Sequence, residues 1–313
     1  MMTQNQHPIE EYLSCRLCPR ACGVNRYKTT GFCGAGTVPK LARAALHLWE
    51  EPCISGKRGS GAVFFSGCTL RCCFCQNFSL SHENFGRELP GADGGVSSLS
   101  DIFLRLQDEG AETLNLVTPT QYLPTVLRSL DRVKHRLSIP IVLNCGGYET
   151  VETIRLLNGY IDVYLPDFKY ADSAPAKRYS AAKDYPERAL AALTEMIAQC
   201  GEEEIDTPPE GEILKRGVII RHMVLPSLRK DSITVLNLLH DTLPEHHWLL
   251  SLMSQYTPFY KAALFPEINR RLTSFEYDSV LKEARRLDLR GYMQARTSAK
   301  EEYTPPFDLS GVP

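Results

Sequence analysis

Residues 62–77 read AVFFSGCTLRCCFCQN, an apolar run that leads directly into four closely spaced cysteines. The run at 62–65 has the continuous apolar character of a strand that is buried on both faces. Cys68, Cys72 and Cys75 follow it with the spacing C-x3-C-x2-C. Three thiolates on one tight loop can hold three irons of a cubane iron–sulfur cluster and leave the fourth iron open to another ligand. The stretch therefore predicts a cluster site just past the end of a strand.

Two other interpretations of these cysteines remain open. Four thiols in a short stretch could be half of a zinc site, or they could be buried small apolar side chains. The spacing differs from the paired C-x2-C of zinc ribbons and fingers, which favours the cluster. Cys73 adjoins Cys72 and is expected to point away from it, so we interpret Cys73 as a packing residue.

Outward from this stretch, apolar strands alternate with amphipathic helices. The pattern predicts helices at 98–110, 122–137, 150–158, within 174–200, and at 231–243, and strands at 113–117, 140–144, 161–165, 217–225 and 247–252. With 62–65 this gives six strands, and the β-then-α order implies right-handed crossovers in a parallel sheet. We therefore expect an α/β fold, a partial (β/α)6 TIM-like barrel. The acidic stretch 201–212 is expected to be a solvated excursion, and a further helix is expected at 275–288.

Composition limits the classes of function. The 313 residues include 35 basic and 37 acidic side chains, a net charge of -2, so no global basic field favours nucleic acid. No apolar run approaches the roughly 20 residues that span a bilayer, and the first residues lack the pattern of a secretion signal. We therefore expect a cytoplasmic location. Eleven cysteines in such a chain should stay reduced, which favours metal binding over disulfides. We expect a Cys-rich extension at 1–57, the barrel at 58–260, and a helix and tail at 261–313.

The cysteine motif, with the aromatic Phe74 just before its last cysteine, resembles the signature of the radical S-adenosylmethionine (SAM) superfamily. The segments GAVFFSGC, CQNFSLS, NLVTPTQY, LPDFKY and SLMSQYTP extend the resemblance to the branch related to pyruvate formate-lyase activating enzyme, over most of 41–260. The resemblance implies a [4Fe-4S] cluster that cleaves SAM reductively to a 5′-deoxyadenosyl radical for hydrogen abstraction. It also implies flavodoxin or ferredoxin as the electron donor.

The resemblance leaves the substrate open. A glycyl-radical enzyme, activated by loss of a hydrogen from a glycine, is the partner that this branch implies. A small molecule or another protein is an alternative. A third possibility comes from a different class of protein, an iron–sulfur or zinc protein that keeps the fold without catalysis, because a fold alone does not establish a function.

Ligands of parallel α/β folds bind at the carboxyl ends of the strands, where several candidate residues follow the predicted strands. Relatives commonly carry a Gly-Gly-Glu-type segment for the SAM amino group after the second strand, whereas this chain has Thr118-Pro119-Thr120 and lacks that carboxylate. Alternation along a strand allows only one of Arg221 and His222 to face the interior. The candidates for contact with SAM or substrate are Phe74, Thr118, Thr120, Asn144, Asp167, Lys169, Arg221 and His222, with Gln255 and Tyr256 lining the opening.

A second group of cysteines, Cys15, Cys18, Cys22 and Cys33, supplies four thiols in 19 residues. Four thiolates suffice to close a tetrahedral site, so the group predicts either a structural zinc or an auxiliary iron–sulfur cluster. The remaining interpretation is a reduced Cys-rich lid without metal.

Overall fold

The computed structural model describes residues 9–207, 211–294 and 304–313. One sheet organises these residues, with the strand order β10-β9-β8-β6-β5-β4-β2-β1-β3. Its parallel part is made of β2 (Ser60–Phe65), β4 (Leu114–Val117), β5 (Ile141–Cys145), β6 (Val163–Pro166), β8 (Ile213–Met223), β9 (Leu249–Met253) and β10 (Gly291–Met293). The first six are the six predicted strands in the predicted order, which confirms an α/β fold with an open, partial barrel.

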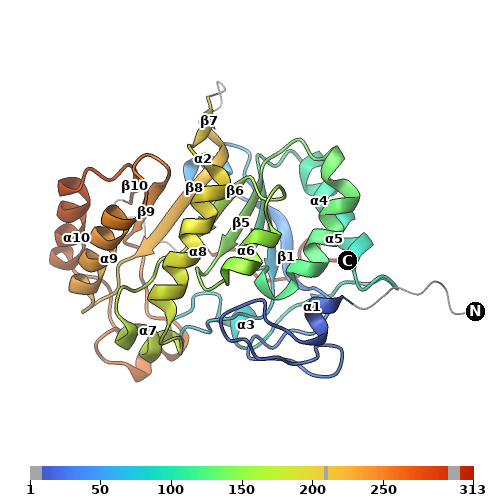
Figure 1. Cartoon of the computed structure of the whole chain (residues 1–313), viewed down its shortest axis with the longest axis horizontal. Coiled ribbons are helices and arrows are strands. Elements are labelled where there is room, and N and C mark those ends of the chain that lie inside the picture. The colour runs from blue at the N-terminus through green and yellow to red at the C-terminus, as the bar shows by residue number, and fades with distance from the viewer. Residues whose placement is uncertain (1–8, 208–210, 295–303) are drawn as a thin grey trace, which may run out of the picture.

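The helices cover one side of the sheet, and six of them pack in pairs (Figure 1). The pairs are α4 (Val96–Asp108) with α5 (Leu123–Val133), α6 (Val151–Leu156) with α8 (Tyr185–Cys200), and α9 (Arg229–Thr242) with α10 (Ser274–Arg286). The predicted helical region 174–200 contains two helices, α7 (Ser173–Ser180) and α8, because the chain turns at Ala181 with a φ of 51°. Short helices are α1 (Glu10–Leu13), α2 (Pro52–Ser55), α3 (Phe78–Ser81), η1 (Thr120–Tyr122), η2 (Lys134–Arg136) and η3 (Tyr260–Leu264).

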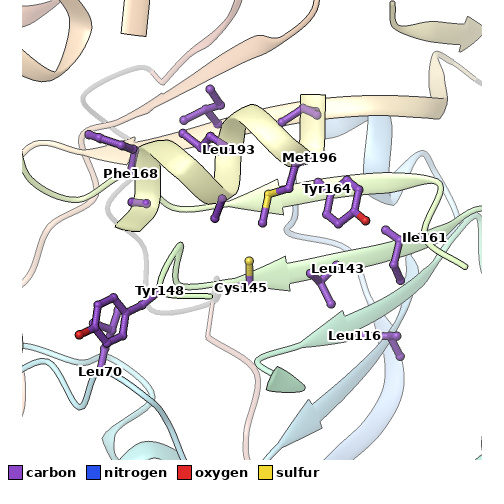
Figure 2. Packing of buried hydrophobic residues seen from close by; sticks show 14 of the residues in the cluster. Leu70, Leu116, Leu143, Cys145, Tyr148, Ile161, Tyr164, Phe168, Leu193 and Met196 are labelled. Atoms are coloured by element: carbon purple, nitrogen blue, oxygen red, sulfur yellow. The ribbon is translucent and has the colours of Figure 1, made fainter. Parts of the chain in front are cut away.

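The core lies between the sheet and this helical layer. Figure 2 shows Leu193 and Met196 of α8 above Tyr164 of β6 and Leu143 of β5, and all four side chains are fully buried. Burial of each such side chain stabilises the fold by roughly 1.5–3 kcal/mol before the loss of conformational entropy is counted. This packing explains why the central strands are apolar on both faces and carry no polar alternation.

Four strands have no counterpart in the sequence-based prediction, and one of them, β10, extends the parallel part of the sheet beside β9. β1 (Lys40–His47) lies within the predicted extension 1–57, yet it pairs antiparallel with β2 in the main sheet. β3 (Arg87–Glu88) pairs antiparallel with β1. β7 (Glu204–Asp206) is exposed and pairs antiparallel with β8. It lies in the acidic stretch 201–212, which we expected to be a solvated excursion; residues 208–210 of that stretch lie outside the described residues. In the parts of the chain that the structure describes, no helix is both long and apolar enough to cross a membrane.

The segment 304–313 also joins the sheet. The backbone N–H of Leu309 donates to the carbonyl of Ala42, and the N–H of Ala44 donates to the carbonyl of Ser310. Arg43 forms an ion pair with Asp308 over 3.1 Å. The segment therefore runs along the free edge of β1, and its first residues reach the end of the sheet where the strands finish.

Candidate functional site

A cavity of about 230 Å³ opens at the carboxyl ends of the parallel strands. The loops after β2, β4, β5 and β6 and the end of β8 build its wall, as expected for a ligand site in a parallel α/β fold. Ten of the predicted residues line it: Cys68, Cys72, Cys75, Thr118, Thr120, Asn144, Asp167, Lys169, Arg221 and Gln255. The structure thus brings together, in one place, side chains from six separate segments of the sequence.

The three motif thiols face this cavity, and each sulfur has a hydrogen-bond donor. The N–H of Leu70 donates to Cys68 Sγ over 3.4 Å, the hydroxyl of Ser180 to Cys72 Sγ over 2.9 Å, and the hydroxyl of Ser81 to Cys75 Sγ over 3.3 Å. Such donors stabilise sulfur that carries negative charge, as it does when it is bound to iron. Cys73 does not line the cavity, in agreement with its interpretation as a packing residue.

Burial acts against free thiolates at this loop. It raises the pKa of Cys68 and Cys72, and it raises the pKa of Cys75 to about 12, while the nearby charge of Lys169 lowers the pKa of Cys68 and Cys72. Thiols in such a place stay protonated unless a cation displaces the proton. Three soft sulfur ligands, a local positive charge and an adjoining cavity fit a thiolate-bound iron–sulfur cluster.

A network of charged side chains forms another part of the cavity wall. Asp167 accepts from Lys169 Nζ over 2.5 Å and from Arg221 Nε over 3.0 Å. Burial alone would raise the pKa of Asp167, but the charges of Arg221 and Lys169 lower it below its usual value. Arg221 also donates to Asn144 Oδ1 over 2.6 Å. Two cations therefore share the Asp167 carboxylate at the end of β6 and hold it in place.

Two carboxylates that the sequence reasoning missed also line the cavity. Glu50 follows β1 and lies 3.6 Å from Arg221, with Asn144 Nδ2 at 3.4 Å from each of its oxygens. Glu149 follows β5 and accepts from the hydroxyl of Thr120 over 2.8 Å. Burial raises the pKa of both. Glu50 gave no signal because β1 was not predicted, whereas Glu149 stands in Gly146-Gly147-Tyr148-Glu149, directly after a predicted strand.

Three predicted contact residues lie outside this cavity. His222 is buried on the opposite side of β8 from Arg221, and its Nδ1 donates to the carbonyl of Phe168 over 2.7 Å. Tyr256 is buried and donates to the carbonyl of Ile268. Phe74 packs edge-on against Tyr256 with ring centroids 5.8 Å apart, beside a smaller pocket of about 50 Å³ that also touches Asp167 and Lys169. Strand alternation thus selects Arg221 for the site and His222 for the core.

Comparisons with known proteins establish a family. The chain is 31% identical over 286 residues to the uncharacterized protein MJ0674 of Methanocaldococcus jannaschii, which covers 89% of this chain and 76% of that protein. The chain belongs to the family of this archaeal protein. Among family models, none matches the chain. A similar solved structure is that of Streptococcus suis SuiB bound to S-adenosylmethionine, with a TM-score of 0.46 and 13% identity over 72% of this chain; the match spans 44% of the SuiB chain, less than half of its length.

In this member of the MJ0674 family, the N-terminal cysteines adjoin the motif loop. Cys15, Cys18, Cys22 and Cys33 line one small cavity of about 20 Å³ together with Thr69 and Thr120. The carbonyl of Cys33 accepts from the N–H of Cys68 over 3.3 Å, and a Cβ on Gly67 would lie 2.6 Å from that carbonyl oxygen. Among the described residues, no three His, Cys, Asp or Glu side chains are arranged to hold a single metal ion. Zinc or an auxiliary cluster at these four thiols stays a prediction.

Proposed function

We propose that the protein is a radical SAM enzyme, an oxidoreductase that holds a [4Fe-4S] cluster on Cys68, Cys72 and Cys75. The observation that carries this proposal is the position of these thiols. All three line one cavity at the carboxyl ends of the strands, each sulfur has a donor, and charged side chains line the same cavity. Bound to these three cysteines, such a cluster would supply the electron that cleaves SAM to methionine and a 5′-deoxyadenosyl radical.

The residues of the cavity suit the groups that SAM carries. Lys169 and Arg221 place positive charge where the ligand carboxylate would lie, and Asp167 holds both cations in place. Burial of the side chains around them strengthens these interactions and limits the access of water to a reactive intermediate. The chain thus binds, orients and shields the ligand, while the cofactors supply the redox chemistry.

For the substrate we propose a glycyl-radical enzyme, with flavodoxin or ferredoxin as the electron donor. The support is the resemblance to activating enzymes together with the exposed rim beside the cavity. Trp49 lines the cavity and is 48% exposed, and the adjacent Leu48 is 53% exposed. Large apolar side chains at a rim suit contact with a protein segment. A pyruvate formate-lyase labelled with α-deuterated glycine tests this: deuterium in the 5′-deoxyadenosine supports an activase, and its absence favours a small-molecule or other protein substrate.

The reaction itself is tested anaerobically. The protein is reconstituted with iron and sulfide, reduced with dithionite and given SAM, and iron, zinc and 5′-deoxyadenosine are quantified. We expect 5′-deoxyadenosine from the wild type and none from Cys72→Ala. Cys73→Ala is the matched control, because it removes the neighbouring thiol that does not line the cavity. A loaded cluster that yields no 5′-deoxyadenosine would instead indicate a non-catalytic iron–sulfur protein, and full activity of Cys72→Ala would refute the ligand assignment.

A further inference from the structure

Glu149 lines the cavity and carries a buried oxygen that has no hydrogen-bond partner among the described residues. The residue is 1% exposed, and its Oε1 accepts from the hydroxyl of Thr120 over 2.8 Å. Its Oε2 is buried and has no hydrogen-bond donor in the described part of the chain. A side-chain hydrogen bond from the Cys145 thiol, a weak donor, lowers the pKa of Glu149, yet Oε2 itself is left without a hydrogen-bond partner. Burying a carboxylate oxygen without a hydrogen-bond donor costs free energy of folding. The unpaired Oε2 therefore indicates that a bound ligand supplies the donor.

The loop that carries Glu149 is held in one conformation. Gly147 has a φ of 75°, and a Cβ there would lie 2.1 Å from the carbonyl oxygen of Asp167. The hydroxyl of Tyr185 lies 2.9 Å from the carbonyl of Gly146 and 2.8 Å from that of Asp167, and it accepts from the N–H of Lys169 over 3.0 Å. The loop is therefore attached to the end of β6, and Glu149 is preorganised rather than free to turn away.

The cations of the cavity are already committed to other carboxylates. Lys169 pairs with Asp167, and Arg221 pairs with Asp167 and lies near Glu50. Neither makes an ion pair with Glu149 among the described residues. The missing donor is thus best supplied by an N–H group of the ligand itself. SAM has two such groups, the adenine amino group and the α-amino group, and only the α-amino group can carry the positive charge that a carboxylate binds most strongly.

We propose that Glu149 Oε2 accepts a hydrogen bond from the α-amino group of SAM, an assignment that rests on the proposed function. It gives Thr120 a role as well. Radical SAM relatives have a carboxylate after the second strand. Here the hydroxyl of Thr120 stands at that place and orients the carboxylate of Glu149, which follows the next strand, β5. Thr120 is then a positioning residue, and Glu149 is the residue that touches the ligand.

The test compares SAM with the analogue whose α-amino group is replaced by hydrogen. Equilibrium dialysis of the oxidised, cluster-loaded protein measures the dissociation constants of both ligands, so no cleavage is needed. In Glu149→Gln, we expect the amide oxygen to keep the hydrogen bond from the Thr120 hydroxyl. The amide NH₂ group then faces the ligand, so that two hydrogen-bond donors, this NH₂ and the α-amino group of SAM, meet without an acceptor. We expect Glu149→Gln to weaken SAM binding at least about tenfold and to leave the binding of the analogue unchanged.

Glu50→Gln is the matched control, since it neutralises another carboxylate of the same cavity whose neighbours are Asn144 and Arg221. We expect it to change the affinities for the two ligands by the same factor. Equal effects of Glu149→Gln on both ligands, or no effect on either, would overturn the assignment. If Glu149→Gln does not fold, Thr120→Val must show the same selective loss for SAM in a smaller degree. Failure of the wild type to bind or cleave SAM would instead refute the proposed function.

Discussion

The hydroxyl of Ser180 donates a hydrogen bond to the sulfur of Cys72 over 2.9 Å, although the two residues are 108 positions apart in the sequence. Ser180 is the last residue of α7, and its hydroxyl also lies 2.9 Å from that of Tyr170. The N–H of Cys73 donates to the carbonyl of Tyr179 over 2.8 Å. The end of α7 thus holds the motif loop by both side chain and backbone, and it places a donor on one of the proposed cluster ligands.

We expect Ser180→Ala to lower the reduction potential of the cluster by tens of millivolts. A donor to a ligating sulfur stabilises the more negative, reduced state, so its loss favours the oxidised state. A redox titration followed by electron paramagnetic resonance measures the midpoint potential. Ser279→Ala, on the exposed face of α10, serves as the control and should leave the potential unchanged. An unaltered potential in Ser180→Ala would exclude this role for the hydroxyl.

Lys169→Ala should weaken SAM binding by about tenfold or more. The change removes one of two cations from the charged wall and leaves Asp167 with Arg221 alone, so the wall repels the ligand carboxylate more strongly. Isothermal titration of the cluster-loaded protein with SAM measures the effect. Lys215→Ala is matched in charge but removes an exposed lysine that lies 3.9 Å from Asp206 in the β7–β8 hairpin, and it should bind SAM normally. Unchanged affinity in Lys169→Ala would remove this residue from the site.

His222 should make the fold sensitive to acid. Burial lowers the pKa of His222 to about 4, whereas an unfolded histidine titrates near 6.5. Between these values the unfolded chain binds the proton and the folded chain does not, so stability is full above about pH 6.5 and falls toward pH 4, by up to about 3 kcal/mol. In His222→Asn, urea unfolding across this range should show a shallower decline. It should not vanish, since burial also lowers the pKa of His47 to about 4. An identical decline in the variant would contradict the assignment.

Gly147→Ala tests the close approach of the Glu149 loop to β6. A methyl group there would lie 2.1 Å from the carbonyl oxygen of Asp167, in addition to the strain of a φ of 75°. Gly159→Ala is the matched control, because its φ is 79° but nothing lies within 4 Å of the added Cβ. We expect Gly159→Ala to cost about 1 kcal/mol of unfolding free energy and Gly147→Ala at least about 2 kcal/mol more. Equal costs, measured by chemical denaturation, would show that the loop can move aside.

The parallel strands were predictable because each is a short, continuously apolar run between helices, as Ile141–Cys145 illustrates. The cysteine loop was predictable because its ligands lie within eight residues of each other. In both cases the signal is local. Strand alternation predicted that only one of Arg221 and His222 faces the cavity. Which of the two does so depends on how β8 pairs with β6, and the sequence of one strand does not reveal that pairing.

The parts that were missed depend on contacts between distant segments. β1 carries charged residues such as Arg43, which pairs with Asp308 from the far end of the sequence, so its pattern does not resemble a buried strand. Glu50 enters the cavity only because β1 pairs with β2. Glu149 was overlooked for another reason: a carboxylate was sought after the second strand, where relatives have one, whereas here the third strand supplies it.

The rim of the cavity joins residues from opposite parts of the chain. Gln76, in the loop that carries the cysteines, donates to the hydroxyl of Thr304, 228 residues away in the sequence, and Pro305 lies on the same rim. A ribosome makes the cysteine loop long before it makes Thr304, so during synthesis the loop is exposed while the helices and strands behind it are already able to pack. Iron delivery before Thr304 and Pro305 emerge would meet an open loop. Iron that arrives after Thr304 and Pro305 have folded onto the rim would have to pass a narrower opening to reach the proposed cluster site.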